Sequence, residues 1–365
     1  VLQALNPGND FLNEKFKSPN VILVMSESYA DFRQFEQLDI SPDVYAGYDK
    51  VKSEGFEGKS IVPTIGGYTV MTEFELMFGL PVKSINGYSM PHRLLDNKEQ
   101  NTVAQYFGSI GYETAYVHPF NETFYSRNTI YANYGFDTML FIEDMKQENF
   151  RHYTDDVTVF DTIIDMLKEN DHATYVHTTT MQNHKPYVDE NNKDDELGFY
   201  LEGIRHSSDA LEDFTEQLKE LDEPTIVLFI GDHYPCFNAS SGVYEELGID
   251  QSNCYELYEQ SYLLWSNYDA DLTKAPQERV SAFYLPHVLV DVIEAPQSDF
   301  IGTMLDKMKE LPNYTLTGRG DIGHDSELDM LTYDRIRGDR YSYEEISFDI
   351  EYKNLSINNT LQRSK

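Results

Sequence analysis

Short apolar runs that turn polar at their carboxyl ends constrain the fold of this chain more than any other feature of its sequence. Residues 20–28 read Asn-Val-Ile-Leu-Val-Met-Ser-Glu-Ser, and residues 225–233 read Thr-Ile-Val-Leu-Phe-Ile-Gly-Asp-His. Both runs are nearly all apolar before their polar ends, which is typical of strands buried on both faces of a parallel sheet. Further strand patterns cover residues 112–118, 173–180 and 261–267.

Segments with helical spacing of apolar residues lie between these strands. Residues 69–79, 158–169 and 200–221 are amphipathic, and Gly79 and Pro81 give stop signals after the first segment. The alternation predicts an α/β fold with a doubly wound, mostly parallel sheet sandwiched by helices. Ligands bind such sheets at the carboxyl ends of the strands, which is where Ser-Glu-Ser, His-Pro and Gly-Asp-His stand in this sequence.

The alternation fades after about residue 298, so we expect three parts along the chain. Residues 1–18 are predicted to be a linker from an N-terminal membrane segment that the sequence does not include. Residues 19–300 are predicted to form the catalytic domain, and residues 301–365 a small C-terminal subdomain and tail. This last part shows a helical pattern near residues 326–337 and alternation over residues 343–352.

The charge of the chain excludes one class of partner. The 63 acidic and 28 basic residues give a formal net charge of −35. Such a surface repels nucleic acid and anionic headgroups over most of its area, although it does not fix the field inside a cleft. We therefore expect no nucleic-acid partner.

Acidic and histidine side chains at two strand ends indicate a metal site. Asp232 and His233 follow the strand at 225–231, and Glu27 follows the strand at 20–26. Each is also compatible with a capping role at a turn. Because acids in a crevice are costly unless they are paired or bound to metal, two such strand ends favour a shared cation.

Thr69 is the candidate nucleophile. It follows Gly66 and Gly67, which allow a tight turn, and it opens the predicted helix. A hydroxyl there is commonly a helix cap, but the helix N-terminus also favours a phosphoryl oxygen, and a nearby cation would lower the hydroxyl pKa. Thr64 precedes the glycines and Thr72 lies one turn inside the helix, so both fit this role less well.

Five motifs in order resemble the lipoteichoic acid synthase family of the alkaline phosphatase/sulfatase superfamily, over roughly residues 19–295. The motifs are Pro-Asn-Val-Ile-Leu-Val-Met-Ser-Glu-Ser at 19–28, Gly-Tyr-Thr-Val-Met-Thr-Glu-Phe at 67–74, Phe-Tyr-Ser-Arg at 124–127, Asn-His-Lys-Pro-Tyr at 183–187 and Gly-Asp-His-Tyr at 231–234. The resemblance implies one divalent cation, Mn²⁺ before Mg²⁺ or Zn²⁺, at Glu27, Thr69, Asp232 and His233. It also implies a phosphothreonine intermediate at Thr69.

The resemblance further implies a substrate-binding set. Arg127 and His184 match positions that contact the substrate phosphate or headgroup, and Tyr125 stands where the family has Trp. Phe120 aligns with an acidic headgroup contact, for which Asn121 or Glu122 could substitute. His118 ends a strand beside this loop and is either a substrate contact or a structural residue. We expect structural roles for His172 and His177.

The predicted activity follows from this family. Thr69 would take a phosphoglycerol headgroup from phosphatidylglycerol, an anionic phospholipid, and pass it to a teichoic acid or glycan acceptor at the extracellular face of a bacterial membrane. Alternatives are a phosphoethanolamine transferase, a sulfatase or phosphodiesterase on the same fold, and a catalytically inactive binding domain. The residues Val-Met-Thr-Glu after Thr69 do not match the Cys/Ser-x-Pro-x-Arg pattern of sulfatases. The extracellular setting also favours a disulfide between Cys236 and Cys254.

Overall fold

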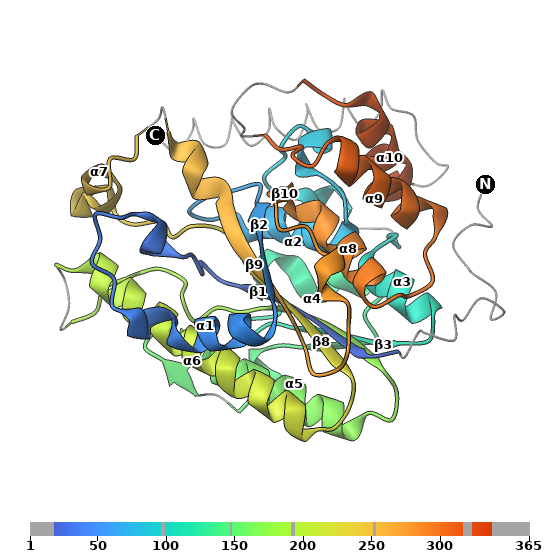
Figure 1. Ribbon diagram of the computed structural model, residues 1–365, viewed down its shortest axis with the longest axis horizontal. Coiled ribbons are helices and arrows are strands. Elements are labelled where there is room, and N and C mark those ends of the chain that lie inside the picture. The colour runs from blue at the N-terminus through green and yellow to red at the C-terminus, as the bar shows by residue number, and fades with distance from the viewer. Residues whose placement is uncertain are drawn as a thin grey trace.

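An eight-stranded mixed sheet forms the centre of the computed structural model (Figure 1). The structure describes residues 18–95, 99–146, 148–190, 194–250, 253–316 and 323–337. The strands are β1 (Asn20–Ser26), β2 (Phe56–Ile61), β3 (Glu113–Val117), β4 (Thr138–Leu140), β7 (Thr174–Thr179), β8 (Thr225–Gly231), β9 (Glu259–Ser266) and β10 (Val280–Ser281), in the order β10-β2-β9-β8-β1-β7-β3-β4. Only β9 runs antiparallel to its neighbours in this sheet, so the predicted mostly parallel α/β fold is confirmed.

The central position of β1 explains its apolar sequence. It pairs in parallel with β7 on one side and with β8 on the other. Successive side chains of β1 enter opposite cores: Val21 and Leu23 pack in one, and Ile22 and Val24 in the other. Because β1 is buried on both faces, its sequence is a continuous apolar run and not the alternation of apolar and polar residues that a half-exposed strand shows.

Helices cover both faces of the sheet (Figure 1). One face packs against α1 (Ala46–Glu54), α5 (Asp156–Glu169) and α6 (Glu196–Glu220), and the other against α3 (Val103–Ser109), α8 (Leu285–Val292) and α9 (Asp299–Glu310). The helices α2 (Thr69–Phe78) and α10 (Ser326–Arg337) lie on the second side, and α4 (Arg127–Ile130) and α7 (Val243–Glu246) are single turns. The strands β5 (Asn149–Phe150) and β6 (Tyr153–Thr154) form a separate pair.

Capping side chains set where two predicted helices begin. Asp155 accepts a hydrogen bond from the Thr158 amide, so α5 starts at Asp156, two residues before the predicted start. Asp195 accepts from the Gly198 amide, and α6 starts at Glu196. These acids lie outside the apolar pattern, which is why periodicity alone placed both starts too late.

The helix α9 continues the packing of the sheet. Its Ile301 and Met304 lie in the same core as β1 and β8, and the predicted division between residues 300 and 301 falls inside this helix. The division into a catalytic domain and a C-terminal subdomain stays a prediction. Residues 1–17 of the predicted linker and the alternating stretch 343–352 lie outside the described residues.

Two further expectations concern anchoring and cross-linking. Among the described helices, none is long and apolar enough to cross a bilayer. The predicted disulfide is wrong, because Cys236 and Cys254 are not bonded to each other. The side chain of Cys236 instead lies close to Gly66, in the turn that precedes α2, while Cys254 opens a 3₁₀ helix before β9.

Candidate active site

The parallel pairing of β1 and β8 brings the predicted acids together. Ser26 is in register with Gly231, so Glu27 and Asp232 leave adjacent strands at the same edge of the sheet. The backbone amide of Ser28 donates to Asp232 Oδ1 at 2.7 Å, and its hydroxyl donates to Glu27 Oε1 at 2.8 Å. Both acids are buried, and these two hydrogen bonds fix their orientation.

His233 completes a three-residue cluster. Its Nε2 lies 3.1 Å from Asp232 Oδ2 and 3.9 Å from Glu27 Oε1, and one donor atom from each residue lies within 4.8 Å of the others. Its Nδ1 donates to the Tyr234 carbonyl at 2.9 Å, which leaves Nε2 as a lone-pair donor facing the carboxylates. Among the residues that the structure describes, neither Nε2 nor Asp232 Oδ2 has a hydrogen-bond partner. Two carboxylates and an imidazole with unpartnered buried atoms fit a divalent cation.

The electrostatics of the cluster agree with that fit. Burial, and then the neighbouring Asp232, raise the pKa of Glu27. Burial raises the pKa of Asp232 to about 7 and lowers the pKa of His233. Each shift penalises the charged form in a dry environment. A bound cation reverses this penalty, because it supplies the charge that the two carboxylates lack.

A turn with three consecutive positive φ angles places Thr69 beside this cluster. Gly66, Gly67 and Tyr68 have φ of 66°, 143° and 61°, a run that two glycines make accessible. Thr69 is the first residue of α2, and its Oγ1 lies 3.4 Å from Glu27 Oε2. The helix N-terminus and the acidic cluster therefore meet at this hydroxyl.

The two competing hydroxyls have structural partners. Thr64 Oγ1 donates to the Gly67 carbonyl at 2.7 Å and so closes the turn. Thr72 Oγ1 donates to the Asp232 carbonyl at 2.8 Å and fixes α2 against the end of β8. Of the three threonines, only Thr69 lines the cavity that Glu27 and His233 also line.

One cavity of about 310 Å³ collects most of the predicted site residues. Its lining includes Glu27, Thr69, His118, Tyr125, Arg127, His184 and His233. Asp232 lies behind them, hydrogen-bonded to Ser28. Residues from the ends of β1, β3 and β8 thus meet residues from three loops, although they are spread over more than half of the sequence.

Arg127 is held by an acid that sequence reasoning missed. Its guanidinium pairs with Glu73 Oε2 at 2.9 Å, and both side chains are 1% exposed. Tyr131 donates to Glu73 Oε2 at 2.6 Å, and Tyr116 and Thr179 donate to Glu73 Oε1 at 2.8 and 2.7 Å. Burial alone would raise the pKa of Glu73, but the charge of Arg127 and these donors outweigh it and lower the pKa to about 2.

A spacing signal for Glu73 exists in the sequence. Glu73 follows Thr69 by four residues, so both lie on the same face of α2, one turn apart. Since Thr69 faces the cavity, a carboxylate one turn later needs a cationic partner nearby. The sequence did not reveal that this partner is Arg127, 54 residues away.

The two cavity histidines present defined nitrogens. His118 Nδ1 donates to the Thr179 carbonyl at 2.8 Å, so its buried and unpartnered Nε2 is an acceptor. Burial, and then the charge of Arg127, lower the pKa of His118 to about 3, which keeps it neutral. His184 Nδ1 lies 2.8 Å from the Lys185 carbonyl and 3.0 Å from the Tyr153 hydroxyl.

The proposed substitutes for the missing acid do not reach the cavity. Phe120 packs against Phe124 with ring centroids 5.0 Å apart, and Asn121 and Glu122 are exposed and absent from the lining. The two histidines with predicted structural roles are also absent from it. His177 is fully buried, whereas His172 lies on the surface near Glu113.

Comparisons with known proteins identify the family of this chain. Residues 19–307 match the family model described as Sulfatase. The chain is 25% identical over 326 residues to a putative cyclic beta-1,2-glucan modification protein of Rhizobium meliloti, covering 82% of this chain and 50% of the relative. It is 27% identical over 240 residues to the lipoteichoic acid synthase of Staphylococcus saprophyticus, covering 60% and 36%. The chain therefore spans about half or less of the length of these relatives.

A solved structure gives the same fold. The Streptococcus pyogenes phosphoglycerol transferase GacH, in complex with sn-glycerol-1-phosphate, superposes with a TM-score of 0.70 at 22% identity, covering 89% of this chain and 85% of that one. The predicted resemblance to lipoteichoic acid synthases is thus confirmed at the level of sequence similarity and fold. The similarity to named transferases agrees with the prediction of an enzyme.

Proposed function

Because the chain belongs to the sulfatase family, we propose that it is a metal-dependent phosphoglycerol transferase with Thr69 as its nucleophile. The observation that carries the proposal is the meeting of the Thr69 hydroxyl with the buried, incompletely hydrogen-bonded cluster of Glu27, Asp232 and His233. A helix-terminal hydroxyl beside such a cluster suits attack on a phosphoryl group.

The proposal assigns a divalent cation, Mn²⁺ before Mg²⁺ or Zn²⁺, to Glu27, Asp232, His233 and Thr69. When bound, the cation would polarise the phosphoryl oxygens and favour the deprotonated hydroxyl. Glu27 Oε2 accepts from the Thr69 hydroxyl, at a distance of 3.4 Å from Oγ1. Ser28 fixes Glu27 and Asp232 in place through two hydrogen bonds.

The remaining cavity residues fit a phosphoglycerol headgroup. Arg127 contributes a buried cation for a nonbridging phosphate oxygen, and its pairing with Glu73 fixes its position. His118 Nε2 offers an acceptor for a headgroup hydroxyl in the region where the family's acid is absent. Tyr125 lies with its ring centroid 5.1 Å from the Arg127 guanidinium and borders the same space.

The proposed reaction has two displacements. Thr69 Oγ loses its proton to solvent and bonds to phosphorus, and the bond from phosphorus to the diacylglycerol oxygen breaks. The leaving oxygen takes a proton, for which protonated His184 in the cavity is the proposed source. An acceptor hydroxyl of a teichoic acid or glycan then gives its proton to His184 and bonds to phosphorus, while the bond from phosphorus to Thr69 Oγ breaks and Oγ takes a proton from solvent. We place this reaction at the extracellular face of a bacterial membrane.

Intact-mass analysis tests the chemistry directly. The Mn²⁺-loaded protein is incubated separately with vesicles of phosphatidylglycerol and phosphatidylethanolamine, and diacylglycerol release and the mass of the protein are measured. We expect a phosphoglycerol adduct that maps to Thr69 and is absent from Thr69→Ala. Thr64→Ser, which keeps the turn hydroxyl outside the cavity lining, is the matched control and should retain activity.

Three outcomes would contradict the proposal. An adduct on Thr72 would move the nucleophile. Diacylglycerol released from phosphatidylethanolamine alone would favour the phosphoethanolamine alternative. Full metal retention by both Glu27→Gln and Asp232→Asn, measured by elemental analysis, would remove the assigned metal site.

A further inference from the structure

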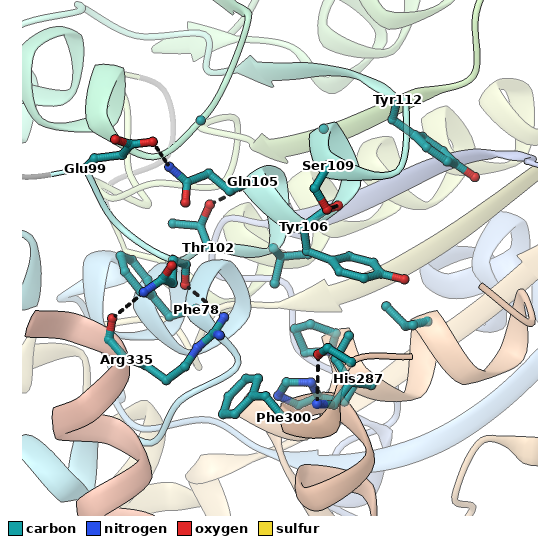
Figure 2. A pocket seen from close by; sticks show the side chains of 18 of the residues that line it. Phe78, Glu99, Thr102, Gln105, Tyr106, Ser109, Tyr112, His287, Phe300 and Arg335 are labelled. Carbon is teal, nitrogen blue, oxygen red and sulfur yellow. Dashed lines mark hydrogen bonds between the residues drawn. The ribbon is translucent and has the colours of Figure 1, made fainter. Parts of the chain in front are cut away.

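Figure 2 shows a second and larger cavity. It has no lining residue in common with the cavity at the acidic cluster. Its volume of about 610 Å³ lies within the range of roughly 300–1,000 Å³ that holds a drug-sized ligand. Its walls come from the carboxyl end of α2, from α3 and α8, and from the starts of β3 and α9, and Arg335 of α10 closes one side. Phe78 at the end of α2 lines it, nine residues after Thr69 at the other end of that helix.

Arg335 places a guanidinium in the wall of this cavity. Among the residues that the structure describes, no carboxylate lies within ion-pair distance of its guanidinium, although the chain has 63 acidic and 28 basic residues. Its Nε has no hydrogen-bond partner in the described part of the chain, and one terminal nitrogen donates to the Asn101 carbonyl at 3.5 Å. Burial lowers the pKa of Arg335 to about 10, so the side chain stays charged at neutral pH. A partly buried charge without a counter-charge is costly, and an anionic ligand would offset that cost.

The surroundings of Arg335 are apolar and aromatic. Its guanidinium carbon lies 4.0 Å from the centroid of the Phe300 ring. His287 packs edge-on against the same ring at 5.3 Å, and its Nε2 donates to the Gly79 carbonyl at 3.0 Å. Figure 2 shows Arg335, Phe300 and His287 side by side, with Tyr106 across the cavity. An acidic group at Arg335 would therefore have apolar surface beside it for the rest of the ligand.

Two carboxylates limit the charge of that ligand. Glu99 and Asp137 also line the cavity. Glu99 accepts from the Gln105 side chain at 3.2 Å, and Asp137 accepts from the Thr114 amide and hydroxyl at 3.1 and 2.9 Å. They would repel a ligand with several negative charges more strongly than a single acidic group placed at Arg335.

From these observations we propose that this cavity binds an amphipathic monoanion, with its acidic group on Arg335 and its apolar body between Phe300, Phe78 and Tyr106. The shared chemistry is one oxyanion joined to an aliphatic or aromatic body, whether it comes from a fatty acid or from a larger lipid. The site is separate from the residues of the proposed phosphotransfer reaction.

Calorimetric titration of the full chain tests the site with three probes, of which decanoate is kept below its micelle concentration and decanol below its solubility limit. Decanoate carries both charge and chain, decanol only the chain, and acetate only the charge. We expect decanoate to bind at one site per chain, and decanol and acetate to bind at least about tenfold more weakly. Arg335→Gln should weaken decanoate by at least about tenfold, while Arg279→Gln, which removes an exposed arginine paired with Glu259, should not.

A second variant keeps the test decisive if Arg335→Gln does not fold. Gly108 lines the cavity from α3, and a Cβ added there has only the Thr114 methyl within 4 Å, at 3.9 Å. Gly108→Leu should therefore be tolerated by the backbone, occupy part of the cavity and weaken decanoate binding. The proposal fails if wild-type protein does not bind decanoate, if acetate binds as tightly, or if Arg335→Gln or Gly108→Leu binds decanoate with unchanged affinity.

Discussion

Two glutamates on α2, two residues apart, are predicted to respond to pH in opposite ways. Glu73 and Glu75 are both buried. Glu73 pairs with Arg127 at 2.9 Å, whereas Glu75 accepts from the Val82 amide at 3.1 Å. Burial raises the pKa of Glu75 to about 8, while Arg127 and three hydroxyl donors overcome burial and lower that of Glu73 to about 2.

The magnitudes follow from these pKa values. Lowering the pKa of Glu73 from 4.5 to about 2 corresponds to about 3 kcal/mol of stability at about 1.4 kcal/mol per unit. Because the folded-state pKa is lowered, this contribution is present above pH 4.5 and is lost as the pH falls towards 2. The pKa of Glu75 rises from 4.5 to about 8, so its contribution of about 5 kcal/mol is present below pH 4.5 and is lost as the pH rises to 8.

The perturbation is Glu73→Gln, with Glu75→Gln as its matched control. At pH 7, Glu73→Gln should lower the free energy of unfolding by about 3–5 kcal/mol, because it leaves Arg127 buried without its counter-charge. Its deficit relative to wild type should shrink as the pH falls from 4.5 towards 2. Glu75→Gln keeps an acceptor oxygen for the Val82 amide, and it should gain stability relative to wild type as the pH rises from 4.5 to 8.

Urea unfolding followed by circular dichroism, repeated between pH 3 and pH 8, measures both effects. Opposite slopes of the two differences against pH are the expected result. The reasoning is refuted if Glu73→Gln is within about 1 kcal/mol of wild type at pH 7, or if both variants show the same slope. Either outcome would mean that Arg127 does not keep Glu73 ionised.

Two further predictions concern the cavity and the strand end beside it. Cys236 is exposed and lines the cavity that contains Thr69. A bulky maleimide should therefore label it without prior reduction and block diacylglycerol release, whereas Cys236→Ser should stay active. Labelling that leaves activity intact would contradict this prediction. A side chain on Gly231 would lie 1.8 Å from the Tyr29 carbonyl, so Gly231→Ala should lower the melting temperature and the metal content. Gly302→Ala in α9, where nothing lies within 4 Å, should change neither, and equal effects of the two alanines would be evidence against the close approach.

Several features of this protein were determined by local sequence. The apolar runs at 20–26 and 225–231 predicted β1 and β8, because burial on both faces demands apolar side chains at successive positions. The polar residues after these runs predicted where Glu27, Asp232 and His233 would meet, since parallel strands end at one edge of the sheet. The two glycines before Thr69 predicted the tight turn that Gly66 and Gly67 form with positive φ.

Only the tertiary structure decided which groups neutralise one another. Glu73 and Arg127 stand 54 residues apart, and their pairing depends on how the loop before α4 packs against α2. The spacing of residues likewise does not show that Arg335 donates to the Asn101 carbonyl, or that Cys236 is not in a disulfide. The spacing of apolar residues along a helix or strand indicates which of its side chains are buried, because it marks the face of that element that packs against the core. The partner of a buried charge is set by the approach of distant segments, which no local pattern encodes.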